Sequence, residues 1–183
     1  MPEQTVGSPV FMVGPMGSGK STVGRHLAGL LGYSFVDSDA EIESRAGADI
    51  PWIFDVEGEA GFRRRETAVL VDLARNRQVV IATGGGAILA EENRQLMTDT
   101  GIVIFLNVSV AQQVKRTGSG EGRPLLQTGD REETLKKLMA EREPLYRELA
   151  DVIISGSGGN ARKVACRIHT QLSERGLISS STD

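Results

Sequence analysis

One segment constrains this chain more than any other. It reads Gly14-Pro15-Met16-Gly17-Ser18-Gly19-Lys20-Ser21 and fills every position of the pattern G-x-x-x-x-G-K-S/T. The apolar run at residues 10–13 predicts a buried strand before it, and the apolar spacing of residues 22–31 predicts a helix after it. A chance match to the pattern would lack this context. Glycines let the backbone turn its N–H groups inward, and a helix N-terminus adds partial positive charge, so the unit predicts a polyphosphate site. We therefore expect the chain to bind a nucleoside triphosphate, with Lys20 reaching the β- and γ-phosphates and Ser21 ligating Mg²⁺.

Length and charge bound the class of protein. With 183 residues, the chain suits one domain with one large core, spanning residues 1–183. Its formal net charge of −3 argues against a nucleic-acid partner, which would need a basic face. The arginines are scattered except at residues 63–65, where we expect at least one on a solvated helix face. No basic leader and no run long enough to span a membrane is present, so we expect a cytoplasmic protein with no membrane partner.

The single cysteine, Cys166, excludes an internal disulfide and does not suggest a structural zinc site. Its neighbours Val164, Ala165 and Ile168 are apolar. We therefore expect Cys166 to be a small core residue of a helix.

Short apolar runs alternate with helical patterns along the whole chain. The runs predict five strands, at residues 10–13, 34–37, 79–82, 102–106 and 152–154. Helices are predicted at residues 22–31, 40–45, 51–57, 58–75, 91–98, 110–116, 131–149 and 161–175. This alternation predicts a three-layer α/β/α fold with a five-stranded parallel sheet, each strand covered on both faces. Because ligands gather at the carboxyl ends of parallel strands, the residues just after each strand are candidates for a site.

One stretch, residues 117–129, breaks this rhythm. It is rich in glycine and long for a loop inside a compact domain, so we interpret it as a mobile lid. Arg123 within it is a candidate for a residue that closure brings to the phosphates, although a solvated surface arginine fits the loop equally well. We expect the tail at residues 177–183 to be disordered.

Two carboxylates follow the second predicted strand, at Asp37 and Asp39. In an extended chain, residues two apart point the same way, so both side chains can project toward the phosphate loop. Phosphoryl transfer needs one carboxylate near the metal and another to orient the attacking hydroxyl. An N-cap of the following helix is an alternative role for Asp39.

The third predicted strand leads into Gly84-Gly85-Gly86. Three consecutive glycines suggest bare N–H groups that face a ligand. Glu66 can hold the guanidinium of Arg63 on a helix, although a surface ion pair would look the same in sequence. Together with Arg142 in a later helix, these residues would suit a small molecule that is anionic and hydroxylated.

In this order and spacing, the motifs resemble those of shikimate kinases over roughly residues 9–172. The specific ones are Asp37-x-Asp39, Gly58-Glu59-x-x-Phe62-Arg63-x-x-Glu66, Gly84-Gly85-Gly86, Arg123-Pro124-Leu125-Leu126 and Arg142-x-x-x-Tyr146. The resemblance implies a P-loop kinase fold and a monomer. It also implies ATP-dependent phosphorylation of the 3-hydroxyl of shikimate, a step of chorismate and aromatic amino acid biosynthesis. At residues 118–122 the sequence departs from the family, with more glycine and fewer basic residues than many relatives.

The resemblance also implies roles for individual residues. Catalysis would fall to Lys20, Asp39 and Arg123. ATP would be bound by Gly17, Ser18, Gly19, Lys20, Ser21, Thr22, Arg116 and Arg123. Shikimate would be bound by Asp39, Arg63, Gly84, Gly85, Gly86 and Arg142. Mg²⁺ would be ligated by Ser21 directly and by Asp37 through water. Phe54 and Phe62 would shape the acceptor pocket, and Trp52 would either lie near it or pack in the core.

Two other functions fit parts of the pattern. A kinase for gluconate or a nucleoside monophosphate could share the fold, but the first needs no pair of convergent arginines and the second needs more than two. A nucleotide-gated switch would carry an Asn-Lys-x-Asp string for guanine, which is absent from the chain.

Overall fold

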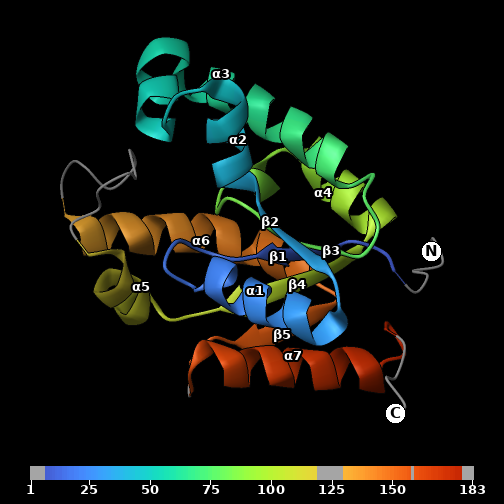
Figure 1. The fold of residues 1–183 in the computed structure, drawn as a ribbon. Helices are drawn as coiled ribbons and strands as arrows, with labels where there is room; N and C mark the ends of the chain where they lie inside the picture. The colour runs from blue at the N-terminus through green and yellow to red at the C-terminus, as the bar shows by residue number, and fades with distance from the viewer. Residues whose placement is uncertain (1–6, 119–129, 158, 179–183) are drawn as a thin grey trace.

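The computed structural model describes residues 7–118, 130–157 and 159–178, and these form one twisted sheet between two layers of helices (Figure 1). The sheet has five strands in the order β2-β3-β1-β4-β5, and every pairing is parallel. The strands are β1 (Val10–Val13), β2 (Ser34–Asp37), β3 (Val79–Ala82), β4 (Ile102–Asn107) and β5 (Val152–Ser155). The predicted three-layer α/β/α fold is confirmed.

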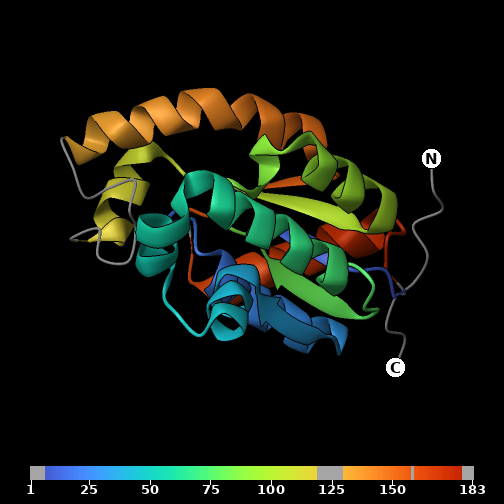
Figure 2. The ribbon, with the colours of Figure 1, turned by 90° about the horizontal axis from the view of Figure 1, so that it is seen from above.

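Two apolar clusters, one on each face of the sheet, make the core. Successive side chains of β1 alternate between them, since strand residues point to opposite faces in turn. Phe11 and Val13 join the cluster with α3, α4 and α6, whereas Val10 and Met12 join the cluster with α1 and α7. Figure 2 shows the same two helical layers from above.

Burial along the sheet follows strand order. All residues of β1 and β3 are buried, and β4 is buried over its first five residues. In contrast, β2 has no buried residue and β5 alternates buried with exposed ones. The expectation that every strand is covered on both faces was wrong for β2 and β5, because these strands form the two edges of the sheet.

The helices match the predicted segments with small shifts at their ends. They are α1 (Lys20–Leu31), α2 (Ser38–Ala46), α3 (Ile50–Leu73), α4 (Glu91–Thr100), α5 (Val110–Thr117), α6 (Arg131–Leu149) and α7 (Ala161–Glu174). α3 consists of two helical segments that meet at a kink at Gly58, where φ is 71° and ψ is 178°, so the predicted division between residues 51–57 and 58–75 is confirmed. A short 3₁₀ turn, η1 (Ala87–Leu89), was not predicted. No helix among the described residues is long and apolar enough to cross a membrane.

Two expectations about burial, and one of the two alternatives for Trp52, were wrong. Cys166 is exposed, because the buried stripe of α7 runs through Val164, Ala165, Ile168 and Leu172 and leaves it on the outer face. Trp52 is 52% exposed, so it does not pack in the core. Ile178 is buried against the α1–α7 side of the sheet, so the expected tail does not begin at residue 177. Residues 179–183 lie outside the described residues.

Thr117, the first residue of the expected lid, belongs to a helix and not to a loop. Thr117 is buried as the last residue of α5, and its hydroxyl donates to the carbonyl of Gln113 at 2.8 Å. Residues 119–129, and with them Arg123, lie outside the described residues.

Candidate functional site

The phosphate loop connects the carboxyl end of β1 to the N-terminus of α1. Gly19 caps the helix with a φ of 92°, a conformation that glycine adopts without a steric penalty. Lys20 begins the helix and folds its side chain over the loop, donating to the carbonyls of Gly14 at 2.8 Å and Pro15 at 2.9 Å. The ammonium group is therefore held above the concave face of the loop, where phosphate oxygens would lie.

Ser21 and Asp37 meet beside this loop. The Ser21 hydroxyl donates to Asp37 Oδ2, while Asp37 Oδ1 accepts from the backbone N–H of Asp39 at 3.0 Å. A hydroxyl and a carboxylate are oxygen donors of the kind that Mg²⁺ prefers, so the pair fits this ion. Among the described residues, no group of three or more His, Cys, Asp and Glu side chains could hold a metal. A Mg²⁺ ion held here would complete its shell with phosphate oxygens and water.

Asp39 lies in the first turn of α2 and not in an extended segment, so the reasoning from strand alternation was wrong. The N-cap alternative for Asp39 was also wrong, because Asp37 fills that role by accepting from Asp39 and Ala40. Both carboxylates nevertheless reach the same pocket as the phosphate loop. Burial raises the pKa of Asp39 from 3.8 to about 6, with smaller contributions from the nearby charges of Glu66 and Asp37.

One pocket of about 340 Å³ joins the loop to Asp39, Gly84 and Gly85, whereas the other predicted acceptor residues, Arg63, Gly86 and Arg142, are not part of its lining. Its lining is Met16, Gly17, Gly19, Lys20, Ser21, Thr22, Asp37, Asp39, Thr83, Gly84, Gly85 and Arg116. A second pocket of about 250 Å³ shares Gly19, Thr22 and Arg116 with it and extends to Gly156 and Gly159. The Arg116 guanidinium donates to the carbonyls of Ser18 at 3.2 Å and Gly156 at 3.3 Å, and so bridges the loop and the segment after β5.

Each glycine of the turn after β3 lies against a different polar side chain. A Cβ atom at Gly86 would be 2.4 Å from Arg63 Nη2, and one at Gly85 would be 3.7 Å from Arg142 Nη1. A Cβ at Gly84 would be 2.7 Å from Glu66 Oε1 and 2.9 Å from Asp39 Oδ1. Side chains at the first and third positions would therefore displace these groups. The two arginines therefore lie against neighbouring glycines of one turn, and their shared binding of a carboxylate stays a prediction.

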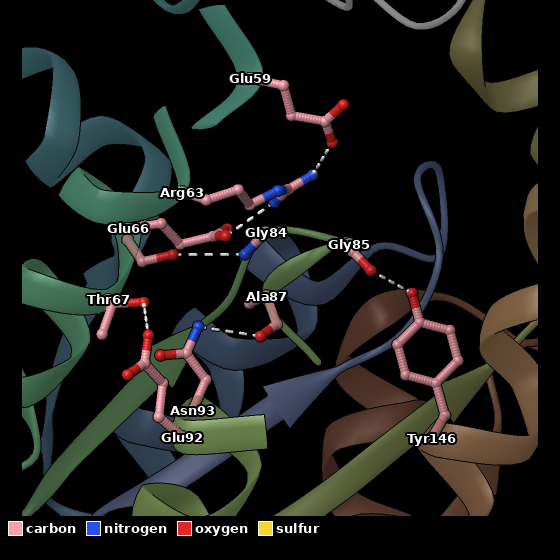
Figure 3. A network of polar contacts seen from close by, with 11 residues as sticks. Glu59, Arg63, Glu66, Thr67, Gly84, Gly85, Ala87, Glu92, Asn93 and Tyr146 are labelled. Atoms are coloured by element: carbon pink, nitrogen blue, oxygen red, sulfur yellow. Dashed lines mark hydrogen bonds and ion pairs between the residues drawn. The ribbon is translucent and has the colours of Figure 1, made fainter. Parts of the chain in front are cut away.

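Arg63 is held from two sides (Figure 3). Its Nη1 lies 2.7 Å from Glu66 Oε2, and its Nη2 lies 3.3 Å from Glu59 Oε1. The Glu66 side chain has no exposed area, so the alternative of a surface ion pair was wrong. Burial raises the pKa of Glu66, and the positive charges of Arg63 and Arg142 oppose that effect.

Phe54 and Phe62 border the same place. Their ring centroids are 4.8 Å apart, and the guanidinium carbon of Arg63 lies 5.2 Å from the centroid of Phe62. Neither ring lines the pocket of about 340 Å³, so the expectation that they shape the acceptor pocket stays a prediction.

Sequence reasoning missed the contacts that hold the turn of residues 84–86, the glycine turn. The N–H of Gly84 donates to Ser38 Oγ at 3.2 Å, so it is not bare as expected. Asn93 Nδ2 donates to the carbonyl of Ala87 at 2.9 Å, and the Tyr146 hydroxyl donates to the carbonyl of Gly85 (Figure 3). Ser38, between the two aspartates, and Tyr146, within the arginine motif, had a signal in the sequence; Asn93 had none.

Comparison with known proteins agrees with this geometry. A family model described as shikimate kinase matches residues 16–173. A shikimate kinase of Halorhodospira halophila is 57% identical over 161 residues, which cover 88% of this chain and 91% of the relative. The chain belongs to the shikimate kinase family. A shikimate kinase of Vibrio campbellii is 51% identical over 166 residues, covering 91% of this chain and 96% of the relative.

Solved structures of the family share the fold. The shikimate kinase of Acinetobacter baumannii in complex with shikimate superposes with a TM-score of 0.92 at 48% identity, covering 95% of this chain and 97% of that one. The shikimate kinase of Aquifex aeolicus gives a TM-score of 0.81 at 35% identity, covering 93% and 99% of the two chains. Membership of the shikimate kinase family makes this chain a phosphotransferase that uses a nucleotide.

Proposed function

We propose that this chain transfers the γ-phosphoryl group of ATP to the 3-hydroxyl of shikimate, giving shikimate 3-phosphate and ADP. One observation carries the proposal. A single pocket is lined by Lys20 and by Asp39, Gly84 and Gly85, so a triphosphate and an acceptor can meet in it. The relative whose structure contains shikimate supports the choice of acceptor.

The nucleotide would bind with its phosphates in the loop of residues 14–21. Backbone N–H groups, the α1 N-terminus and Lys20 supply positive charge there. Arg116 and the adjoining pocket of about 250 Å³ would receive the rest of the nucleotide. Ser21 would ligate Mg²⁺, and Asp37 would hold one of the ion's waters. When bound, the ion supplies charge that neutralises the phosphate oxygens.

The acceptor would bind at the glycine turn. Arg63 and Arg142 lie against adjacent glycines, and two guanidinium groups can each pair with a carboxylate through short, charge-assisted hydrogen bonds. Arg142 is 5% exposed, and its Nε has no hydrogen-bond partner among the described residues, so its charge is poorly hydrated. A carboxylate would offset this desolvation. Asp39 Oδ1 also has no partner among the described residues, and it would accept from a hydroxyl of the acceptor.

The reaction would be a direct in-line transfer without a covalent intermediate. The protein would contribute position and positive charge rather than a nucleophile of its own. Asp39 would orient the attacking hydroxyl and accept its proton, and Lys20 would stabilise charge on the transferred group. By resemblance, Arg123 would add a second positive charge. We further propose that the chain acts in the cytoplasm as a monomer, which size-exclusion chromatography with light scattering would test.

Coupled ADP release tests the function. Purified protein with Mg²⁺ and ATP should release ADP when shikimate is present, and not with gluconate or AMP.

Lys20→Ala should lower turnover by about two orders of magnitude or more. Asp39→Asn should nearly abolish turnover while ATP still binds. Chelation of Mg²⁺ by EDTA should stop the reaction. Release of ADP that does not depend on the acceptor, or that occurs with gluconate alone, would overturn the proposal.

A further inference from the structure

The side chain of Tyr146 contacts the glycine turn but has no role in the proposed reaction. The Tyr146 hydroxyl donates a hydrogen bond to the carbonyl oxygen of Gly85 (Figure 3). The ring is fully buried and stacks on Phe105, with centroids 4.9 Å apart and planes at 23°. Burial raises the pKa of the Tyr146 phenol well above its ordinary value, so the hydroxyl remains a donor at all working pH values.

Tyr146 follows Arg142 by one turn of α6, so one face of this helix contacts the glycine turn twice. Arg142 Nη1 lies beside Gly85, and the Tyr146 hydroxyl holds the carbonyl of the same residue. The two contacts have different consequences. The guanidinium leaves the backbone free to rotate, whereas the hydroxyl fixes the direction of one peptide plane.

That plane contains the carbonyl of Gly85 and the N–H of Gly86. In a planar trans peptide these two groups point in opposite directions, so a donor that holds the oxygen also aims the N–H. With Tyr146 on one side, the Gly86 N–H points to the other, and an added Cβ at Gly86 would meet the Arg63 guanidinium. Within the part of the chain that the structure describes, no hydrogen bond uses the Gly86 N–H.

The peptide groups on either side of the Gly85–Gly86 peptide are held by other hydrogen bonds. The N–H of Gly84 donates to Ser38, the carbonyl of Gly84 accepts from Ala87 at 3.1 Å, and the carbonyl of Gly86 accepts from Leu89 at 3.0 Å. Among the described residues, Tyr146 supplies the one hydrogen bond to the Gly85–Gly86 peptide. Because glycine lies on both sides, rotation of this peptide meets little steric resistance. Without the hydroxyl, the plane could turn.

We propose that Tyr146 is a positioning residue of the acceptor site: its hydroxyl locks the Gly85–Gly86 peptide so that the Gly86 N–H donates to the anionic group held by Arg63 and Arg142. The inference rests on the proposed function of this site. The contact of Gly86 with the acceptor is already part of that function, and the inference adds the task of Tyr146.

Tyr146→Phe tests the inference, since it removes only the hydroxyl, which also contacts the Arg142 guanidinium, and keeps the ring that stacks on Phe105. We expect the KM for shikimate to rise about tenfold, the loss typical of one hydrogen bond to a charged group. The Kd for shikimate, measured by calorimetry without nucleotide, should rise by the same factor. The KM for ATP should stay within about twofold, because the phosphate loop is untouched.

A matched control separates position from stability. The Thr100 hydroxyl donates to the carbonyl of Leu96 at 2.7 Å in α4, and Thr100 does not line the pocket. Thr100→Val also deletes one hydrogen bond from a hydroxyl to a backbone carbonyl. It should lower the melting temperature, as Tyr146→Phe does, and leave both KM values unchanged. A purely structural Tyr146 would give the same pattern as Thr100→Val, and that result would overturn the inference.

A second measurement needs no variant. The amide proton of Gly86 in the wild-type protein should move downfield in the NMR spectrum when shikimate saturates the site. An unmoved Gly86 signal during saturation would refute the inference even if Tyr146→Phe did not fold. Wild-type protein that releases no ADP with shikimate would refute the proposed function instead. An active wild type with an unaltered Tyr146→Phe KM would refute only the role of Tyr146.

Discussion

The pKa of Asp39 is shifted by its burial and by several charged neighbours. Burial raises the pKa most, and the neighbouring carboxylates Glu66 and Asp37 raise it further. The positive charges of Lys20 and Arg63 lower it. The net result is a pKa of about 6, against 3.8 for an ordinary aspartate. Above this pH the charge is present at a cost in stability, as is common at catalytic sites.

The sign of that cost gives a pH prediction. Between pH 3.8 and about 6, the folded chain holds a proton on Asp39 that the unfolded chain has lost, so stability falls as the pH rises through this window. Asp39→Asn has no carboxyl to titrate. The free energy of unfolding of the variant, relative to wild type, should therefore rise by about 2–3 kcal/mol between about pH 4 and 7.

Urea denaturation at a series of pH values measures this difference. The exposed Asp99→Asn variant controls for the change of aspartate to asparagine. A difference between Asp39→Asn and wild type that stays constant, or falls with rising pH, would show that Asp39 is not strained in its charged form.

Gly86 offers a second test at the scale of one residue. The methyl group of Gly86→Ala would occupy space 2.4 Å from Arg63 Nη2 and 2.7 Å from its Cζ, so the flexible guanidinium must move. We expect the chain to fold, because the displaced group is a side-chain end, and the KM for shikimate to rise about tenfold or more. The KM for ATP should not change. Steady-state kinetics with each substrate varied would check this, and an unaltered KM for shikimate would remove Arg63 from the acceptor site.

The sequence predicted which side chains pair at this site better than it predicted the backbone conformation that carries them. The pairing of Arg63 with Glu66 follows from helical spacing and is confirmed. Asp37 and Asp39 were placed in one extended segment, whereas the helix begins between them and makes Asp37 the cap. Helix starts are set by local capping competition between neighbouring polar residues, and two aspartates with a serine between them leave that choice open.

At the scale of elements, the break in α3 sets the direction of the half that carries Arg63. Gly58 lies in a region of φ and ψ that is essentially restricted to glycine. Arg65 pairs with Glu57 across the break, with Nη2 2.7 Å from Oε1 and Nε 2.9 Å from Oε2. Because this pair is partly exposed to solvent, the backbone of Gly58 rather than the ion pair should hold the bend.

Gly58→Ala tests that view. An added Cβ at Gly58 would meet nothing within 4 Å, so any cost comes from the backbone alone. We expect a loss of about 1–3 kcal/mol in the free energy of unfolding. Gly29→Ala, in the last turn of α1 and also without atoms within 4 Å, should instead stabilise by about 0.5–1 kcal/mol. Urea denaturation of both variants decides, and two similar changes would show that the Gly58 backbone is not strained for alanine.

Apolar patterns located the strands well, because short apolar runs between polar segments have few other uses in a domain of this size. The same patterns also placed the division between residues 51–57 and 58–75 correctly, since Gly58 is non-helical and a kink separates the two helical halves there. They gave no sign of η1, whose three residues are too short for a period to appear.

At the scale of the whole molecule, strand order brings the site together. In the order β2-β3-β1-β4-β5, the carboxyl ends of β1, β2 and β3 are neighbours, and they carry the phosphate loop, the aspartates and the glycine turn. Local patterns do not encode which strands pair. The order was therefore outside the reach of the sequence argument, and so was the exposure of β2 and β5 as edges.

The central claim is that this one cleft joins a triphosphate to a carboxylated alcohol. NMR spectroscopy of the products tests it most directly, using purified protein with ATP, Mg²⁺ and shikimate and correlating phosphorus with the protons of the ring. We predict one equivalent of shikimate phosphorylated on the 3-oxygen for each ADP formed. ADP without a phosphorylated acceptor, or phosphate on another hydroxyl, would contradict the account.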